Sequence, residues 1–306
     1  MKIVNPSVKL LPISTTYDEM LRDIERAAEI CVASTKYHDP VDDYINSLIK
    51  RKHYRTLEFG TAYVEVPVFR DPVLIKEQHI ENYFWKKVMD SPWTKKSSFN
   101  ENLITTNCRV LQEVQDEMQS KKDMFYWTLD MCDWKKYVQK RWKYTDQHKH
   151  RYTFLWEISR ATADSFRTYV SISSLMQSTR YCNFSSSKFG GEITYIRPNW
   201  WEHDYETTPQ NEFTPHEHLF IRSWKNAEDY YLSAITLGME AQHARGVLPL
   251  DIRTEFIQCA YGGDWQNFFD QRAHNSTGPA HDDAQLIATE AENIWVDYMG
   301  DYMERV

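Results

Sequence analysis

The chain has 306 residues, of which 42% are hydrophobic and 14% aromatic, and this composition excludes an intrinsically disordered protein. Its formal net charge of −8 argues against broad electrostatic attraction to nucleic acid or to an anionic membrane. No stretch approaches the roughly 18 uninterrupted apolar residues that span a bilayer, and the five cysteines form no C-x-x-C pair. We therefore expect a cytoplasmic protein without disulfides and without nucleic-acid or membrane partners, in which a local group of arginines would hold any anionic ligand.

The first half of the chain predicts mainly helices. Residues 15–34 place apolar side chains at helical spacing behind Thr15 or Thr16 as the cap, and Asp39-Pro40 begins a second helix that ends near His53. Residues 61–71 alternate like a half-buried strand, which Pro67 places at an edge or a bulge. Further helices are expected at 81–89, 105–119 and 133–144, with a loop at 91–102.

The second half mixes strands and helices without regular β-α alternation. The strands are expected at 151–158 and 192–198, where aromatic and branched residues gather. The helices are expected at 159–173, 227–246, 251–261, 264–272 and 282–299, with a surface loop at 274–281. Because no linker separates these elements, we expect one α+β domain over residues 1–306.

The junction MQSTRYCNF, residues 176–184, carries more polar chemistry than a turn needs. Ser178, Thr179 and Arg180 bring two hydroxyls and a guanidinium to one short segment, which suits a phosphate. The alternative is that Arg180 pairs with an acid while Ser178 caps the turn. The chain has no glycine-rich phosphate motif, so a phosphate would be recognised by side chains.

Other candidate residues have ordinary explanations when they are taken alone. Arg245, expected at the end of a long helix, and Arg272 would each favour the C-terminal end of a helix dipole. His148 and His150 form H-x-H, but no third ligand stands nearby, so a basic loop is favoured over a metal site and no metal is expected.

Taken together, these segments resemble the flavin-dependent thymidylate synthases. That family has a run R-H-R, two residues, Ser, four residues and then Ser-x-Arg-Tyr, and Ser173, Ser178, Arg180 and Tyr181 stand at matching spacing. Further segments agree in order: 27–31, 53–59, 104–113, 244–256 and 265–272. The resemblance spans about residues 15–290, with an apparent insertion around 115–150, and it implies a single domain with a mixed sheet flanked by long helices.

The resemblance also implies an activity and its site. Members of the family are homotetramers that bind FAD and dUMP, and they make dTMP with methylenetetrahydrofolate as carbon donor and NADPH as reductant. Ser178 would orient the nucleotide and Arg272 would interact with the pyrimidine as charge develops, which are the two expected catalytic roles. The full expected nucleotide set is Gln177, Ser178, Thr179, Arg180, Arg245 and Arg272, and the expected flavin contacts are Cys31, His53, Asn267 and His281.

The sequence departs from the family on the flavin side. Thr168, Tyr169 and Val170 stand where the family has Arg-His-Arg, and Tyr261 and Gly263 replace an Asn and an Arg of a later flavin segment. Losing these charge-assisted contacts should weaken or redirect FAD binding. The first hypothesis is a thymidylate synthase with a rebuilt flavin pocket that uses Tyr169 or a Trp. The alternative is a divergent relative that binds dUMP or a related pyrimidine nucleotide with changed chemistry, or without catalysis.

Overall fold

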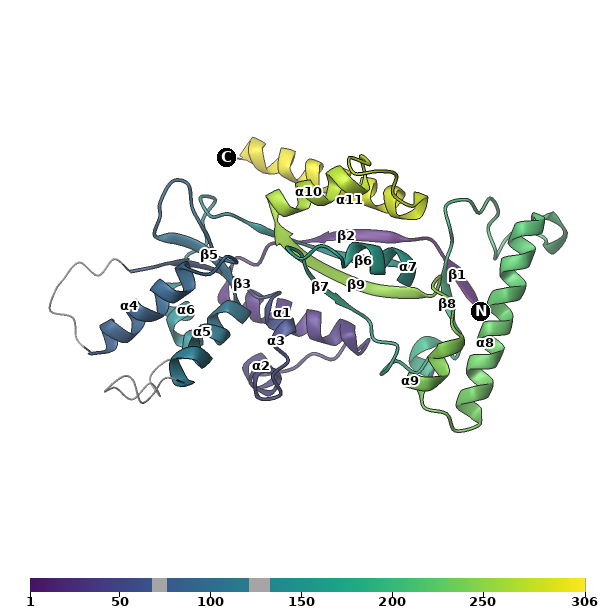
Figure 1. The fold of residues 1–306 in the computed structure, drawn as a ribbon, viewed down its shortest axis with the longest axis horizontal. Coiled ribbons are helices and arrows are strands. Elements are labelled where there is room, and N and C mark those ends of the chain that lie inside the picture. The colour runs from purple at the N-terminus through teal and green to yellow at the C-terminus, as the bar shows by residue number, and fades with distance from the viewer. Residues whose placement is uncertain (68–75, 121–132, 306) are drawn as a thin grey trace.

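A four-stranded antiparallel sheet forms the centre of an elongated molecule (Figure 1). The computed structural model describes residues 1–67, 76–120 and 133–305. The strands lie in the order β2 (Ser7–Leu11), β6 (Arg151–Ser159), β9 (Arg253–Tyr261) and β7 (Ser173–Met176). Both β6 and β7 pair with β9, where Trp156 and Met176 each lie opposite Phe256. Since β7 pairs on one side only, it is an edge of this sheet.

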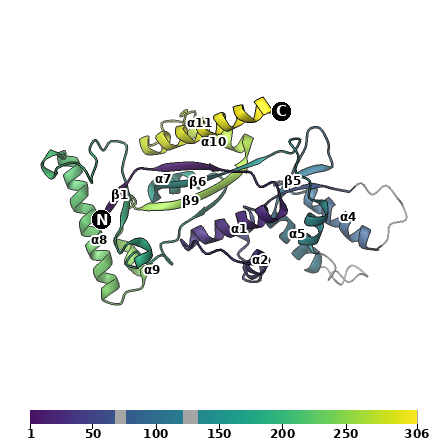
Figure 2. The same cartoon turned by 180° about the vertical axis from the view of Figure 1, so that it is seen from behind.

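Helices cover both faces of the central sheet (Figures 1 and 2). One face packs Phe154 and Trp156 against the helices α7 (Arg160–Phe166), α10 (Gly262–Arg272) and α11 (Asp282–Arg305). The other face packs Leu155 and Ile257 against α1 (Tyr17–Cys31). This alternation along β6 and β9 is what a sheet buried on both sides requires.

Two smaller groups of elements flank the central sheet (Figure 1). One contains an antiparallel sheet in the order β3 (Thr61–Glu65), β5 (Leu103–Asn107) and β4 (Lys95–Lys96), with α2 (Val41–Lys50), α3 (Tyr54–Leu57), α4 (Lys76–Met89), α5 (Cys108–Ser120) and α6 (Trp134–Arg141). The other contains the parallel pair β1 (Lys2–Val4) and β8 (Thr194–Ile196), with α8 (Pro215–Thr236), α9 (Ala241–Ala244) and the 3₁₀ turns η3 (Ser187–Phe189), η4 (Gln210–Glu212) and η5 (Arg245–Val247).

The predicted α+β class is confirmed, and so are the helices α1, α2, α4, α6, α10 and α11, the strands β6 and β8 and the loop 274–281. Thr16 caps α1 in a capping box with Glu19. Pro40 is the N-cap residue of α2 rather than its first helical residue. Parallel pairing occurs in β1 and β8, whereas the central sheet is antiparallel. No helix of the described residues is both long and apolar enough to cross a membrane.

Three expected helices are corrected by the structure. Residues 253–261 form the central strand β9, because a strand buried on both faces loses the alternation that would distinguish it from a helix. The helix expected at 159–173 ends at Phe166, and residues 173–176 pair with β9 instead. The helix expected at 227–246 divides at Gly238, whose φ of 90° ends α8 in the left-handed conformation that glycine permits.

The segment from residue 61 to residue 108 also differs from its expectation. The strand at 61–65 lies at a sheet edge, as expected, but Tyr63 is completely buried, so the strand is not half-exposed. The helix expected from residue 105 begins at Cys108, because residues 103–107 pair with β3 and β4. The loop expected at 91–102 contains the short strand β4. Part of the strand expected at 61–71 and part of the insertion at 115–150 lie outside the described residues.

Candidate functional site

A cleft of about 500 Å³ opens beside the edge strand β7. Residues 174–179 line it together with Phe256 and four arginines, which are Arg55, Arg160, Arg167 and Arg245. We call it the arginine cleft. The polar junction of the sequence therefore follows a strand rather than the expected helix, and Gln177, Ser178 and Thr179 line the same cleft as Arg245.

Backbone hydrogen bonds hold the junction in place. Gln177 N donates to Glu255 O at 2.9 Å, and its side-chain oxygen accepts from Glu255 N at 3.3 Å, which extends the β7–β9 pairing. Ser178 N donates to Cys31 O at 2.9 Å and so joins the junction to the end of α1. Ser178 Oγ accepts from Arg180 N at 3.3 Å, the turn-capping role left open by the sequence.

Two arginines of the cleft are held by the same junction. Arg160 donates to Gln177 O at 3.2 Å, and Arg245 Nη1 donates to Thr179 Oγ1 at 3.0 Å. Burial, together with the charges of Arg167 and Arg245, lowers the pKa of Arg160 although Asp164 opposes this shift. No acidic residue lines the cleft in the part of the chain that the structure describes. Two of the four arginines pair with carboxylates outside the lining, Arg167 with Asp164 at 3.0 Å and Arg55 with Glu58 at 4.0 Å. The positive charge that remains at Arg160 and Arg245 favours an anionic ligand.

Two arginines expected at the nucleotide do not line the cleft. Arg180 is exposed, donates to the amide oxygen of Gln242 at 3.5 Å and lies 5.4 Å from the Tyr181 ring centroid. It therefore pairs with an amide rather than with an acid. Arg272 donates to Ser165 O at 3.2 Å, and its Nε is buried without a hydrogen-bond partner among the described residues. The expected contribution of Arg272 to a nucleotide site stays a prediction.

The four expected flavin contacts lie on opposite faces of the central sheet (Figure 1). Cys31 ends α1 and His53 precedes α3, whereas Asn267 is on α10 and His281 precedes α11. Burial raises the pKa of the Cys31 thiol to about 11, which keeps it protonated at neutral pH. Asn267 accepts from Gln271 at 3.1 Å. The other two, His53 and His281, are exposed. One copy of the chain does not gather these residues.

The three residues in place of Arg-His-Arg contribute no cation. Thr168 Oγ1 donates to Ser165 O at 2.8 Å, and the Tyr169 hydroxyl donates to Gln271 Oε1 at 3.1 Å. Val170 is 88% exposed. Gly263 is exposed as well. The charged dinucleotide FAD therefore does not fit these residues of a single chain, since its anionic groups find no guanidinium at those positions.

His148 and His150 pack into an aromatic cluster instead of a basic loop. Both are buried, and their rings lie 5.3 and 5.7 Å from the Tyr63 ring centroid. Burial lowers the pKa of each imidazole. Within residues 1–67, 76–120 and 133–305, no group of three or more His, Cys, Asp and Glu side chains could hold a metal ion.

Comparison with known proteins gives one family. The model of the thymidylate synthase complementing protein family matches residues 96–297. Similar solved structures include the UMP/dUMP methylase PolB from Streptomyces cacaoi bound with 5-Br UMP, at 11% identity and a TM-score of 0.43 over 97% of this chain and 92% of that chain. ThyX from Helicobacter pylori with FAD and dUMP matches at 14% identity and a TM-score of 0.35 over 47% and 66%. No curated protein matches the sequence.

Proposed function

Because the chain belongs to the family of thymidylate synthase complementing proteins, we propose that it is an enzyme that methylates dUMP to dTMP and binds the nucleotide in the arginine cleft. The observation that carries the nucleotide part is the charge of the cleft: Arg55, Arg160, Arg167 and Arg245 line it without a carboxylate. A phosphate dianion neutralises this group of like charges, and guanidiniums bind phosphate oxygens through paired hydrogen bonds.

The residues of the cleft then have separate tasks. Arg245, held by the Thr179 hydroxyl, and Arg160, held by the Gln177 carbonyl, bind the phosphate. Ser178 lies just after the edge strand, which ends at Met176, and its backbone N donates to Cys31 O. Its hydroxyl orients the nucleotide. Fixed donors of this kind orient a pyrimidine ring without reorganising during the reaction.

Methylation requires a one-carbon donor and a reductant, for which we propose methylenetetrahydrofolate and NADPH from the resemblance. Flavin would supply hydride if it were bound, but the residues of one chain do not fit FAD. We propose a cytoplasmic protein that forms a homotetramer. Sites between subunits would let residues from opposite faces of the sheet, such as Arg272 and Cys31, act together.

A second candidate is a relative that binds the pyrimidine nucleotide and performs other chemistry, or none. It is favoured by one observation: Thr168, Tyr169 and Val170 place no charged group where the family holds flavin. In this case the arginine cleft keeps its ligand while the reaction differs.

Calorimetric titration of the purified protein with dUMP and with deoxyuridine tests the nucleotide proposal. We expect dUMP to bind at least about tenfold more tightly, which corresponds to about 1.4 kcal/mol for the phosphate. Arg245→Ala should remove this difference, whereas Arg222→Ala, at an exposed position of α8, should preserve it. Equal affinity for both compounds would refute the phosphate site.

Growth of a thymidine auxotroph carrying the gene then separates the two candidates. Growth without thymidine, lost in Arg245→Ala, supports the synthase. Continued dependence on thymidine, in a strain whose purified protein binds dUMP, supports the relative with changed or absent chemistry.

A further inference from the structure

An irregular strap, residues 142–150, joins the end of α6 to the start of β6. It begins along the edge of β3, where Trp142 pairs with Val64 and Lys143 N donates to Tyr63 O at 3.0 Å. In the described part of the chain, the backbone contacts of the strap with β3 are confined to these first two residues, whereas β6 and β9 pair along their full length. The rest of the strap is therefore held mainly by its side chains.

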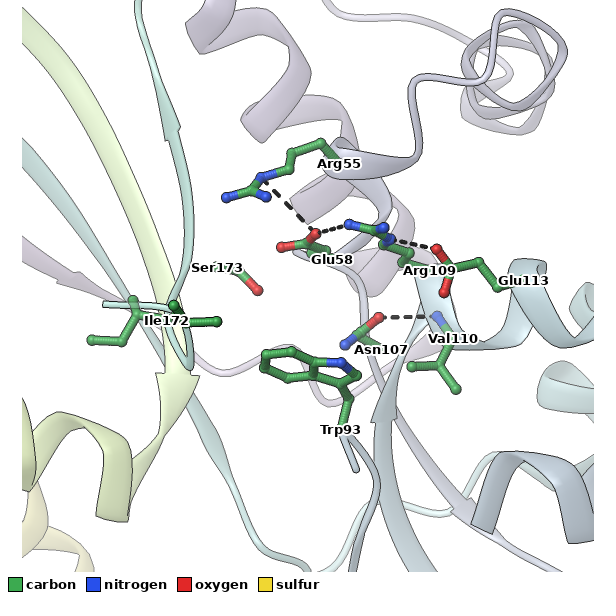
Figure 3. Close-up of a pocket in the computed structure, with 10 residues that line it drawn as sticks. Arg55, Glu58, Trp93, Asn107, Arg109, Val110, Glu113, Ile172 and Ser173 are labelled. Carbon is green, nitrogen blue, oxygen red and sulfur yellow. Dashed lines mark hydrogen bonds and ion pairs between the residues drawn. The ribbon is translucent and has the colours of Figure 1, made fainter. Parts of the chain in front are cut away.

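Arginines at both ends limit the strap. Before it, Arg141 Nε lies 2.9 Å from Glu81 Oε1, and although burial raises the pKa of Glu81, the bond from Arg141 contributes to lowering it overall. After it, the buried guanidinium of Arg151 donates to Glu58 O at 2.8 Å and to Ser173 Oγ at 3.2 Å. Glu58 and Ser173 come from different segments, and both line the pocket drawn in Figure 3. Because arginine stays charged in mild acid, both anchors persist there, and opening of the strap would stop at them.

Two buried histidines hold the second half of the strap against Tyr63. Their rings meet the tyrosine ring edge to face, with centroids 5.3 Å away for His148 and 5.7 Å for His150. His148 Nδ1 and His150 Nε2 lie 3.2 and 3.4 Å from Thr145 O, so both rings fold the strap onto one carbonyl. His148 Nε2 is buried and makes no hydrogen bond within the described residues. A proton on this nitrogen would be a buried donor without a well-aligned acceptor.

The surroundings of the two rings favour the neutral imidazole. Burial lowers the pKa of His148 more than nearby backbone carbonyls raise it, and the charge of Lys143 lowers it further. Burial also lowers the pKa of His150, against the opposing charge of Asp146. Asp146 is exposed. The other titratable or charged groups around the rings are Tyr63 and Glu65 on β3, Tyr144 and Lys149 on the strap, Arg151 and Tyr152 on β6, and Tyr298 on α11.

We propose that the strap is an acid-sensitive switch: protonation of His148 and His150 opens residues 142–150 away from β3 while the central sheet stays folded. In the open strap both imidazoles are in water and bind protons near their ordinary pKa of 6.5, whereas in the closed strap they do so only at lower pH. The closed strap is therefore fully stabilised above about pH 6.5 and becomes less stable as the pH falls below it. Uptake of one proton changes the opening equilibrium about tenfold per pH unit. The switch does not depend on the proposed function.

Hydrogen–deuterium exchange of the full chain, read by mass spectrometry and corrected for the intrinsic pH dependence of exchange, tests the switch. The amides of Lys143 and His148 report on the strap, because both donate to backbone carbonyls when it is closed. Residues 253–261 of β9 report on the central sheet. Protection of the strap should fall at least about tenfold from about pH 6.5 to about pH 5.5, while protection of β9 should change less than about twofold. Equal protection of the strap at both pH values, or a parallel loss in β9, would overturn the inference.

Variants of the same protein identify the groups that take up the protons. His148→Asn and His150→Gln each place an amide N–H near the ring nitrogen that lies against Thr145 O, and neither amide titrates. Each single variant should show about half of the logarithmic change in protection, and the double variant should show none. Glu65→Gln, which removes an ion pair between the strap and β3, and His216→Asn, exposed on α8, should respond to acid as wild type does. An acid response that persists in the double variant, or that disappears in Glu65→Gln, would show that the histidines do not operate the strap.

Discussion

Arg245 Nη1 donates a hydrogen bond of 3.0 Å to Thr179 Oγ1, across 66 residues of sequence. This bond brings together two of the residues expected at the nucleotide, one from the polar junction after β7 and one from η5. It also fixes the guanidinium of Arg245 at the arginine cleft before any ligand arrives, and a fixed guanidinium loses less entropy when it binds phosphate.

Thr179→Val should weaken dUMP binding through Arg245. Valine keeps the shape of the threonine side chain and removes the hydroxyl, at a cost of about 1 kcal/mol or roughly a fivefold higher Kd. The effect should largely vanish in an Arg245→Met background, so a double-mutant cycle by calorimetry should be non-additive. Thr236→Val, at an exposed position near the end of α8, is the control, and additive effects would argue against a coupled pair.

The sequence predicts part of this site because the evidence for it is local. The spacing of Ser173, Ser178 and Arg180 lies within one short segment, and periodic apolar positions behind a capping threonine predict α1. The prediction that Arg245 lies at the nucleotide required the family resemblance as well, because a single arginine near a helix end is explained by the helix dipole alone.

The remaining residues depend on β9, which the sequence does not distinguish from a helix. Its residues are buried on both faces, and only pairing with β6 and β7 makes it a strand. Once β9 is in place, Arg160 and Arg167 come beside β7 through α7, and Arg55 joins them from a distant segment. The neighbouring pocket lined by Trp93 is less predictable still, because Glu58, Asn107 and Ser173, which also line it, meet only through tertiary contacts.

Inorganic phosphate should stabilise the protein against heat by occupying the arginine cleft. Binding to the folded state alone raises stability by RT ln(1 + [L]/Kd), about 2.7 kcal/mol at a hundredfold excess over Kd. The increase in Tm should shrink as NaCl is added at constant phosphate, because salt screens exposed charges. Arg160→Gln should reduce the increase in Tm that phosphate causes, whereas Arg26→Gln, outside the cleft, should leave it unchanged. An equal increase in both variants would mean that phosphate acts elsewhere.

Arg151→Lys should destabilise the fold although it preserves charge. Arg151 is 5% exposed and its guanidinium joins three segments, with bonds of 2.8 Å to Glu58 O, 3.2 Å to Thr61 Oγ1 and 3.2 Å to Ser173 Oγ. Lysine lacks the planar fork that reaches these acceptors together, and we expect a loss of at least about 2 kcal/mol in the free energy of unfolding.

Urea unfolding of Arg151→Lys and of Arg26→Lys provides the comparison. The side chain of Arg26 is 43% exposed, so its variant should stay within about 0.5 kcal/mol of wild type. Similar midpoints for both variants would show that the buried fork of Arg151 adds little to stability.

Glu217 should make the stability of α8 depend on pH in the acid range. Its carboxylate is 1% exposed and accepts from Thr214 N at 2.7 Å and from the backbone N of Glu202 and His203, each at 2.9 Å. Burial raises its pKa, but the bonds from His203 and Thr214 outweigh burial and lower the pKa from 4.5 to about 2. The folded state thus favours the ionised form.

The stability contributed by the ionised carboxylate is therefore complete above about pH 4.5 and is lost as the pH falls toward 2, where the folded state also takes up the proton. Glu217→Gln should be less stable than wild type at pH 7 by about 1 to 3 kcal/mol, because its amide places donors against backbone donors. The difference in the free energy of unfolding between Glu217→Gln and wild type, measured by urea titration, should narrow steadily from pH 4.5 to pH 2. Glu290→Gln, exposed on α11, should show no such gap at any pH. A difference between Glu217→Gln and wild type that stays constant over this range would contradict the assignment, because it would mean that the carboxylate charge contributes nothing to the cap of α8.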